Sequence, residues 1–153
     1  MRLHLSVNRQ RREVECWEGA SLLSVLREGF GLWGTKNACE QGECGSCSVV
    51  VDGVLVCACL ELAATCEGRE VTTIEGLTQD PLARVIQEAF IASGAVQCGF
   101  CTPGFIVAMT EHLRHHPDAD EEEVKEALAG NLCRCTGYTR ILDGWRRARA
   151  NLA

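Results

Sequence analysis

Residues 39–47 of this 153-residue chain read Cys-Glu-Gln-Gly-Glu-Cys-Gly-Ser-Cys, and a further cysteine follows at position 59. The spacing C-x4-C-x2-C with a distant fourth cysteine is that of a plant-type [2Fe–2S] site. Gly42 and Gly45 permit a tight loop and let backbone N–H groups approach the sulfurs. Such donors stabilise a core whose two ferric ions, two sulfides and four thiolates sum to about −2. We call these four cysteines the first quartet: Cys39, Cys44, Cys47 and Cys59.

The segments around this loop predict a small mixed sheet with one packed helix. Residues 2–7 alternate between apolar and polar side chains, as in a half-buried strand. Asp52-Gly53 is a strong signal for a two-residue hairpin turn, because both positions need a positive φ. Ser21 is a good N-cap for a short helix. We expect strands over residues 2–7, 12–16, 48–51, 54–56 and 71–74.

The C-terminal part of the sequence predicts helices instead. Asp80 is a good N-cap, and Pro81 suits the first helical position. Asp120 and Glu123 have the spacing of a capping box. The same logic makes Thr102 the cap before Pro103. We expect four helices, starting near Pro81, Thr102, Asp120 and Thr139, with the first three ending by Gly94, Pro117 and Gly130.

The change of pattern falls at Gly76-Leu77-Thr78-Gln79 and divides the chain into two small domains. The sequence thus predicts an α+β fold. A β-grasp ferredoxin-like domain is expected over residues 1–76, and a four-helix bundle over residues 77–153. Domains of this size bury little apolar core and usually need a staple such as a metal.

Four cysteines of the helical part form a second group, which we call the second quartet: Cys98, Cys101, Cys133 and Cys135. Their pattern is C-x2-C followed by C-x-C, and each pair precedes a predicted helix. Helix N-termini direct N–H donors and a positive dipole end towards a site, which suits an anionic cluster. Spacing alone favours iron–sulfur ligation, with a zinc site or a disulfide as alternatives.

Composition excludes several classes of function. The net charge of −6 disfavours binding to nucleic acid or to an anionic membrane surface. The sequence has no apolar run long enough to cross a bilayer and no secretory signal, so a cytoplasmic location is expected. A reducing compartment favours metal ligation by the eleven cysteines over disulfides. Three cysteines stay outside both quartets: Cys16, Cys57 and Cys66.

Four longer motifs resemble the xanthine dehydrogenase family, also called the molybdenum hydroxylases. Residues 34–47 resemble its N-terminal cluster loop, and residues 73–77 its interdomain junction. Residues 97–104 (QCGFCTPG) and 130–138 (GNLCRCTGY) resemble its two helical-domain motifs. The resemblance covers essentially the whole chain in the family's order. One departure is Ala38, where the family usually has glycine.

The resemblance implies a small iron–sulfur subunit that holds two [2Fe–2S] clusters, one in each quartet. It also implies a large partner subunit with a molybdenum–pterin cofactor and a medium subunit with FAD. Electrons would pass from the molybdenum subunit through the second quartet, then the first quartet, to FAD or another acceptor. By the same resemblance, Gln97 and Cys135 contact the pterin.

Some alternatives stay open on the sequence. A free-standing two-cluster electron carrier of the ferredoxin type is the main alternative function, and a zinc-stapled interaction protein is another. Cys57, two residues before Cys59 on the same strand face, is a rival for the fourth ligand of the first quartet. No catalytic set or substrate motif is evident, so catalysis is expected to reside in the molybdenum subunit. Family frequency alone favours xanthine or a related heterocycle over aldehydes or carbon monoxide as the substrate.

Overall fold

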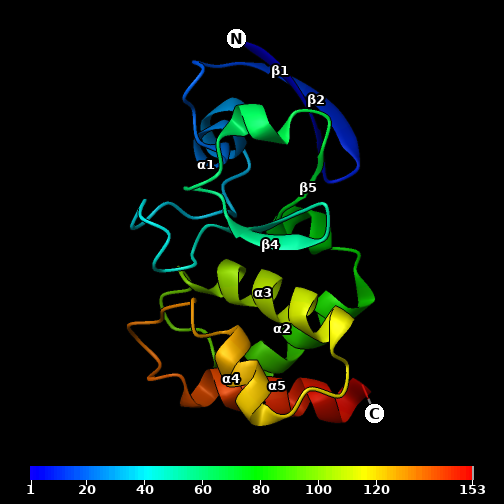
Figure 1. Cartoon of the computed structure of the whole chain (residues 1–153). Coiled ribbons are helices and arrows are strands. Elements are labelled where there is room, and N and C mark those ends of the chain that lie inside the picture. The colour runs from blue at the N-terminus through cyan, green and yellow to red at the C-terminus, as the bar shows by residue number, and fades with distance from the viewer. Residues whose placement is uncertain (153) are drawn as a thin grey trace.

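The computed structural model describes residues 1–152 as a mixed α+β structure, with a five-stranded sheet followed by helices (Figure 1). The strands are β1 (Arg2–Val7), β2 (Gln10–Glu15), β3 (Ser48–Val51), β4 (Val54–Cys57) and β5 (Glu70–Thr72). Their order in the sheet is β2-β1-β5-β3-β4. β1 and β5 run parallel, and the other neighbouring strands are antiparallel. We call residues 1–76 the sheet half and residues 77–152 the helical half.

The predicted Asp-Gly hairpin is confirmed, whereas the last strand is shorter than expected. β1 pairs with β2, and β3 pairs with β4 around the Asp-Gly turn. β5 ends at Thr72, because Thr73 is bound by the turn between β1 and β2. The Asn8 side chain accepts from the Thr73 backbone N–H at 2.9 Å and donates to Thr73 Oγ1 at 3.0 Å. A 3-10 turn over Ile74–Leu77 then leads out of the sheet half.

The helices begin close to their predicted caps. They are α1 (Leu22–Ser24), continued by a π-helical turn (Val25–Gly29), then α2 (Pro81–Ser93), α3 (Thr102–His115), α4 (Glu121–Ala127) and α5 (Thr139–Leu152). Asp80 caps α2, and Asp120 with Glu123 forms the predicted capping box of α4. Thr102 is not a cap, because it is the first residue of α3 and Cys101 holds the N-cap position. No helix within residues 1–152 has both the length and the apolar character needed to cross a bilayer.

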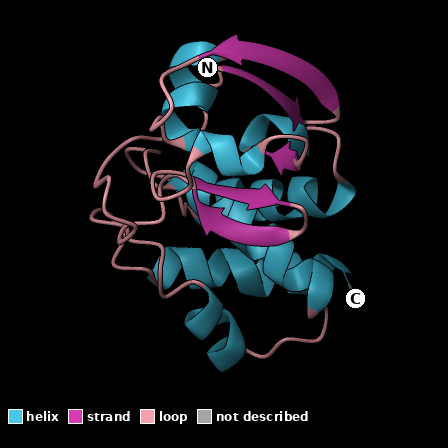
Figure 2. Ribbon diagram, turned by 45° about the horizontal axis from the view of Figure 1, so that its top comes forward, coloured by secondary structure: helices cyan, strands magenta, loops and turns pink. Residues whose placement is uncertain are grey.

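Each half has its own apolar core, and a smaller apolar cluster joins them. In the helical half, α2 packs against α3 and α5, and α3 packs against α4. Between the halves, β3 lies against α3 (Figure 2). The joining cluster consists of Val50, Leu77, Ala83 and Val107. The two halves are therefore fixed relative to each other by direct packing as well as by the chain.

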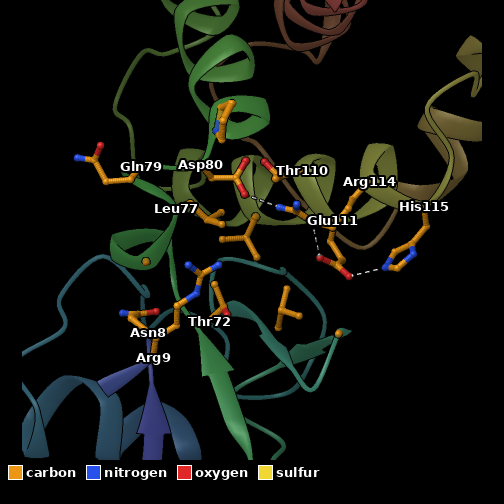
Figure 3. A pocket seen from close by; sticks show the side chains of 15 residues that line it. Asn8, Arg9, Thr72, Leu77, Gln79, Asp80, Thr110, Glu111, Arg114 and His115 are labelled. Atoms are coloured by element: carbon orange, nitrogen blue, oxygen red, sulfur yellow. Dashed lines mark hydrogen bonds and ion pairs between the residues drawn. The ribbon is translucent and has the colours of Figure 1, made fainter. Parts of the chain in front are cut away.

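A cleft of ≈ 570 Å³ opens between the halves at the C-terminal end of α3 (Figure 3). Arg114 Nη2 lies 2.6 Å from Asp80 Oδ2, and His115 Nε2 lies 2.8 Å from Glu111 Oε1. Burial opposes ionisation of Asp80, but hydrogen bonds from the first turn of α2 and the Arg114 guanidinium hold its pKa below the usual range. No cysteine lines this cleft, and it lies at the opposite end of α3 from Cys101.

Candidate metal centres

The first quartet lies on the long loop before β3 and in the turn after β4 (Figure 1). Gly42 and Gly45 have φ angles of 74° and 68°, in agreement with the predicted tight loop. Ala38 is not among the residues of positive φ, so an alanine fits there without backbone strain. The departure from the family pattern at this position therefore leaves the loop conformation intact.

The thiols of the first quartet lie close to one another. Cys39 lies within hydrogen-bonding reach of Cys44, and Cys47 within reach of Cys59. The Gln41 N–H donates to Cys39 Sγ at 3.4 Å, and with two neighbouring N–H groups it lowers the pKa of Cys39 to about 6. Burial, with Cys59 nearby, raises the pKa of Cys47 to about 12. The loop thus stabilises negative charge at Cys39. The buried Cys47 thiol, by contrast, loses its proton readily only when a cation takes the place of that proton.

Cys57 lies beside the first quartet at the end of β4. Its Sγ donates to the carbonyl oxygen of Gly42 at 3.8 Å, and it also reaches Cys47. Burial, followed by the nearby Cys59, raises the pKa of Cys57. The structure therefore brings the rival thiol to the site. By contrast, Cys66 is fully buried in the core of the sheet half.

The second quartet comes together from the loops before α3 and before α5, on the same side of the molecule as the first quartet (Figure 1). Cys98 pairs with Cys135, and both are exposed, whereas Cys101 pairs with the buried Cys133. Burial and the neighbouring Cys133 raise the pKa of Cys101 to about 12. Burial acts in the same direction on Cys133, but hydrogen bonds led by that of the Thr136 hydroxyl outweigh it and lower its pKa.

Each quartet supplies the four thiols that a [2Fe–2S] cluster requires. Such a cluster takes two thiolates at each of two irons, whereas a structural zinc ion takes four ligands around one point. In each quartet neighbouring thiols lie close together, and all eleven cysteines are free thiols. Within residues 1–152, no three His, Cys, Asp or Glu side chains gather as ligands of a single ion.

Hydrogen bonds join the loops that carry the two quartets, and the sequence did not predict them. The backbone N–H of Leu132 donates to the carbonyl oxygen of Cys44 at 2.9 Å, and Leu132 directly precedes Cys133. The buried Asn131 side chain donates to the carbonyl oxygen of Gly45 at 3.1 Å. A ligand of the first quartet is thus one hydrogen bond away from the neighbour of a ligand of the second quartet.

Gly104, in the first turn of α3, allows the two loops to approach. A Cβ atom at this position would lie less than 3.0 Å from the carbonyl oxygen of Gly45, a separation that real Cβ atoms essentially never show. The only signal in the sequence is a glycine where a better helix former would serve α3. That signal does not reveal which segment comes close.

The loops of the second quartet also present an apolar surface. Gln97, Cys98 and Cys135 are exposed. Three large apolar side chains on the same two loops are exposed by 44%, 49% and 39%: Phe100, Leu132 and Tyr138. Grouped exposed apolar side chains of this kind mark interaction surfaces.

Comparison with known proteins defines the class of protein. A family model described as "[2Fe-2S] binding domain" matches residues 73–146. The chain is 41% identical to the nicotinate dehydrogenase small FeS subunit of Eubacterium barkeri over 139 residues, which cover 91% of this chain and 88% of that protein. It is 44% identical to the xanthine dehydrogenase iron-sulfur-binding subunit of Escherichia coli O157:H7 over 144 residues, which cover 92% and 89% of the two chains.

A solved structure extends this similarity to the fold. Quinoline 2-oxidoreductase from Pseudomonas putida 86 superposes with a TM-score of 0.91 at 39% identity, covering 98% of this chain and 94% of that chain. These matches define an iron–sulfur protein of an oxidoreductase. The chain belongs to the small iron–sulfur subunits of the xanthine dehydrogenase, or molybdenum hydroxylase, family. The resemblance seen in the motifs is thereby confirmed.

The same unit also occurs within longer proteins. The aldehyde oxidoreductase of Megalodesulfovibrio gigas is 42% identical to this chain over 134 residues, and the matched segment makes up 15% of that protein. The similar unit is thus a separate subunit in some relatives and a part of a larger polypeptide in others.

Proposed function

We propose that this chain carries electrons through two [2Fe–2S] clusters, from a molybdenum–pterin subunit to an FAD subunit or another acceptor. The single observation that carries the proposal is the gathering of eight thiols in two quartets, whose loops are connected by a backbone hydrogen bond. The proposal includes a ferredoxin-like domain over residues 1–76 and a helical cluster-binding domain with the form of a four-helix bundle over residues 77–153.

Four thiolates would hold each cluster. Cys39, Cys44, Cys47 and Cys59 would bind the first, and Cys98, Cys101, Cys133 and Cys135 the second. Each cluster supplies a one-electron couple when it is bound. The chain's contribution is to fix the sulfur positions and to direct N–H donors at them, as Gln41 does for Cys39. In the first cluster we assign the fourth ligand to Cys59, since Cys57 already donates to a backbone carbonyl.

A bonded route between the loops of the two quartets gives a path for the electron. It leaves Cys133 along the backbone to Leu132, crosses the 2.9 Å hydrogen bond to the Cys44 carbonyl oxygen, and reaches the Cys44 sulfur. The Asn131–Gly45 hydrogen bond lies beside this crossing and fixes the distance between the loops. Cys133 is therefore the ligand of the second quartet from which this route starts.

The two exposed thiols of the second quartet would face the molybdenum subunit. Cys98 and Cys135 are exposed, as is Gln97, and the apolar side chains on the same loops suit a protein interface. In this arrangement Gln97 and Cys135 would contact the pterin. On the other side, Leu60 and Leu62 after β4 are exposed by 63% and 49%, which suits docking of the electron acceptor beside the first quartet.

The substrate of the complex would be set by the partner subunit. Relatives of similar identity are named for nicotinate, xanthine and nicotine.

Metal analysis tests the proposal directly. Anaerobically prepared protein should contain about four irons and four acid-labile sulfides per chain and show two distinct EPR signals after reduction. Fewer than four irons, or a chain without sulfur-to-iron absorption, would exclude two clusters. Co-purification with a molybdenum protein is expected as well, and an isolated monomer with both clusters would instead favour a free-standing carrier.

A further inference from the structure

Three hydrogen bonds form a closed ring around Cys133. The Cys133 backbone N–H donates to Tyr138 Oη at 3.1 Å, and the Tyr138 backbone N–H donates to Thr136 Oγ1 at 3.1 Å. The Thr136 hydroxyl then donates to Cys133 Sγ at 3.1 Å. The ring includes the sulfur of Cys133, which belongs to the second quartet.

The ring fixes the direction of the Thr136 hydroxyl proton. Thr136 Oγ1 already accepts from the Tyr138 N–H, so its single proton is free for the sulfur. Gly137 and Tyr138 have φ angles of 61° and 70°, which turn the chain back on itself and close the ring. The Phe105 and Tyr138 rings pack edge-to-face at a centroid distance of 6.5 Å, which supports the Tyr138 ring.

We infer that the Thr136 hydroxyl raises the reduction potential of the cluster held by the second quartet. This inference rests on the function proposed above. On reduction, one electron converts one ferric ion to ferrous, so the net charge of the cluster falls from about −2 to about −3 while no bond is broken. A hydrogen bond donated to a ligand sulfur stabilises the more negative state more strongly, because the sulfur then carries more charge.

The position of this bond makes it relevant to the electron path. Cys133 is a buried thiol next to Leu132, whose N–H makes the crossing to Cys44. A donor at Cys133 therefore acts on the ligand whose neighbour contacts the loop of the first quartet. Without it, accepting an electron from the molybdenum subunit becomes less favourable.

The test is a dithionite titration of the intact complex, followed by EPR, in wild type, Thr136→Val and Thr136→Ser. Valine removes the donor at similar volume, and serine keeps the hydroxyl. We expect about a tenfold loss in the equilibrium constant for reduction of the second cluster in Thr136→Val, which is about 59 mV for a one-electron couple. The signal of the first cluster should keep its midpoint, and Thr136→Ser should keep the wild-type midpoint for both.

Two outcomes overturn the inference: an unmoved midpoint in Thr136→Val, or an equal shift in Thr136→Ser. If both cluster signals are absent from the wild type, the proposed function fails instead, so the two failures are distinguishable. Should Thr136→Val bind less iron, resonance Raman of the wild type in D2O decides. A shift of the iron–cysteine stretching bands of the second cluster is expected from deuteration of the hydroxyl, and its absence contradicts the inference.

Discussion

Replacing Gly104 by alanine would place a methyl group between the two cysteine loops. The new Cβ atom would meet the carbonyl oxygen of Gly45 and would lie 3.2 Å from Asn131 Nδ2. These two atoms are the acceptor and the donor of the 3.1 Å hydrogen bond that holds the loops together. One methyl group therefore pushes on both partners of this bond, and the backbone of Gly45 cannot move aside as a flexible side chain would.

Three contributions determine how much Gly104→Ala lowers the unfolding free energy. Overpacking of this kind typically costs about 1–3 kcal/mol. Loss of the buried Asn131 hydrogen bond adds about 1 kcal/mol. Alanine in a helix regains roughly 0.5–1 kcal/mol relative to glycine. The net loss for Gly104→Ala is about 2 kcal/mol, and for a chain of this size that lowers Tm by about 4–8 °C.

Gly130→Ala is the matched control, because a Cβ atom there meets nothing within 4 Å and the residue has no positive φ. Its unfolding free energy should stay within about 0.5 kcal/mol of wild type. Thermal and denaturant unfolding of the cluster-loaded chain measure both variants. In the intact complex, Gly104→Ala should also slow reduction of the first cluster by the second, as followed by rapid-freeze EPR. Wild-type stability together with wild-type transfer in Gly104→Ala would refute the role given to this contact.

Three further predictions concern other parts of the chain. Asp80→Ala should lower the unfolding free energy by about 1–2 kcal/mol through loss of the α2 cap and the Arg114 ion pair, whereas Asp80→Asn should keep the cap. Because the pKa of Asp80 is lowered in the folded state, the Asp80 charge stabilises the fold fully above about pH 4, and this stabilisation is lost as the pH falls through the folded pKa. Urea unfolding at a series of pH values should therefore show that the stability difference between Asp80→Ala and wild type shrinks only in acid. Cys59→Ser should abolish the EPR signal of the first cluster, whereas Cys57→Ser should retain it, and the reverse result would exchange their roles. Cys135→Ser should slow reduction of both clusters by substrate while leaving the EPR signal of the first cluster intact, and normal stopped-flow kinetics would contradict the pterin contact.

Local signals in the sequence predicted what depends on neighbouring residues. The alternation of residues 2–7, the Asp-Gly turn and the caps at Asp80 and Asp120 act over a few residues, so the strands and helices lie close to where they were expected. The helix start at Thr102 was interpreted too locally. Cys101 before it already has helical φ and ψ angles of −78° and −17°, because the cysteine loop leads directly into α3, and no side chain is needed as a cap.

The tertiary contacts of the site could not be predicted in this way. Spacing identified the members of both quartets, but the bond from Leu132 to Cys44 joins segments far apart in the sequence. No periodicity of either segment encodes that meeting. It depends on how α3 packs against β3, which only the assembled cores determine. The Thr136–Cys133 contact spans only three residues, but cysteine spacing alone gives no sign that the Thr136 hydroxyl points at the sulfur.

The way the quartets are joined gives a physical reason for combining two small halves in one chain. The crossing uses backbone groups of Leu132, Cys44 and Gly45, with Asn131 as the one side-chain donor. Backbone groups are present whatever the surrounding side chains are, so the distance between the quartets can stay fixed while the exposed loops change to suit different partners. An electron relay needs both a fixed distance and variable loops. Transfer between the two quartets should stay the same when the electron donor or acceptor differs. Occurrence of the same unit both as a separate subunit and within a longer polypeptide agrees with an internal geometry that does not depend on how the partners are attached.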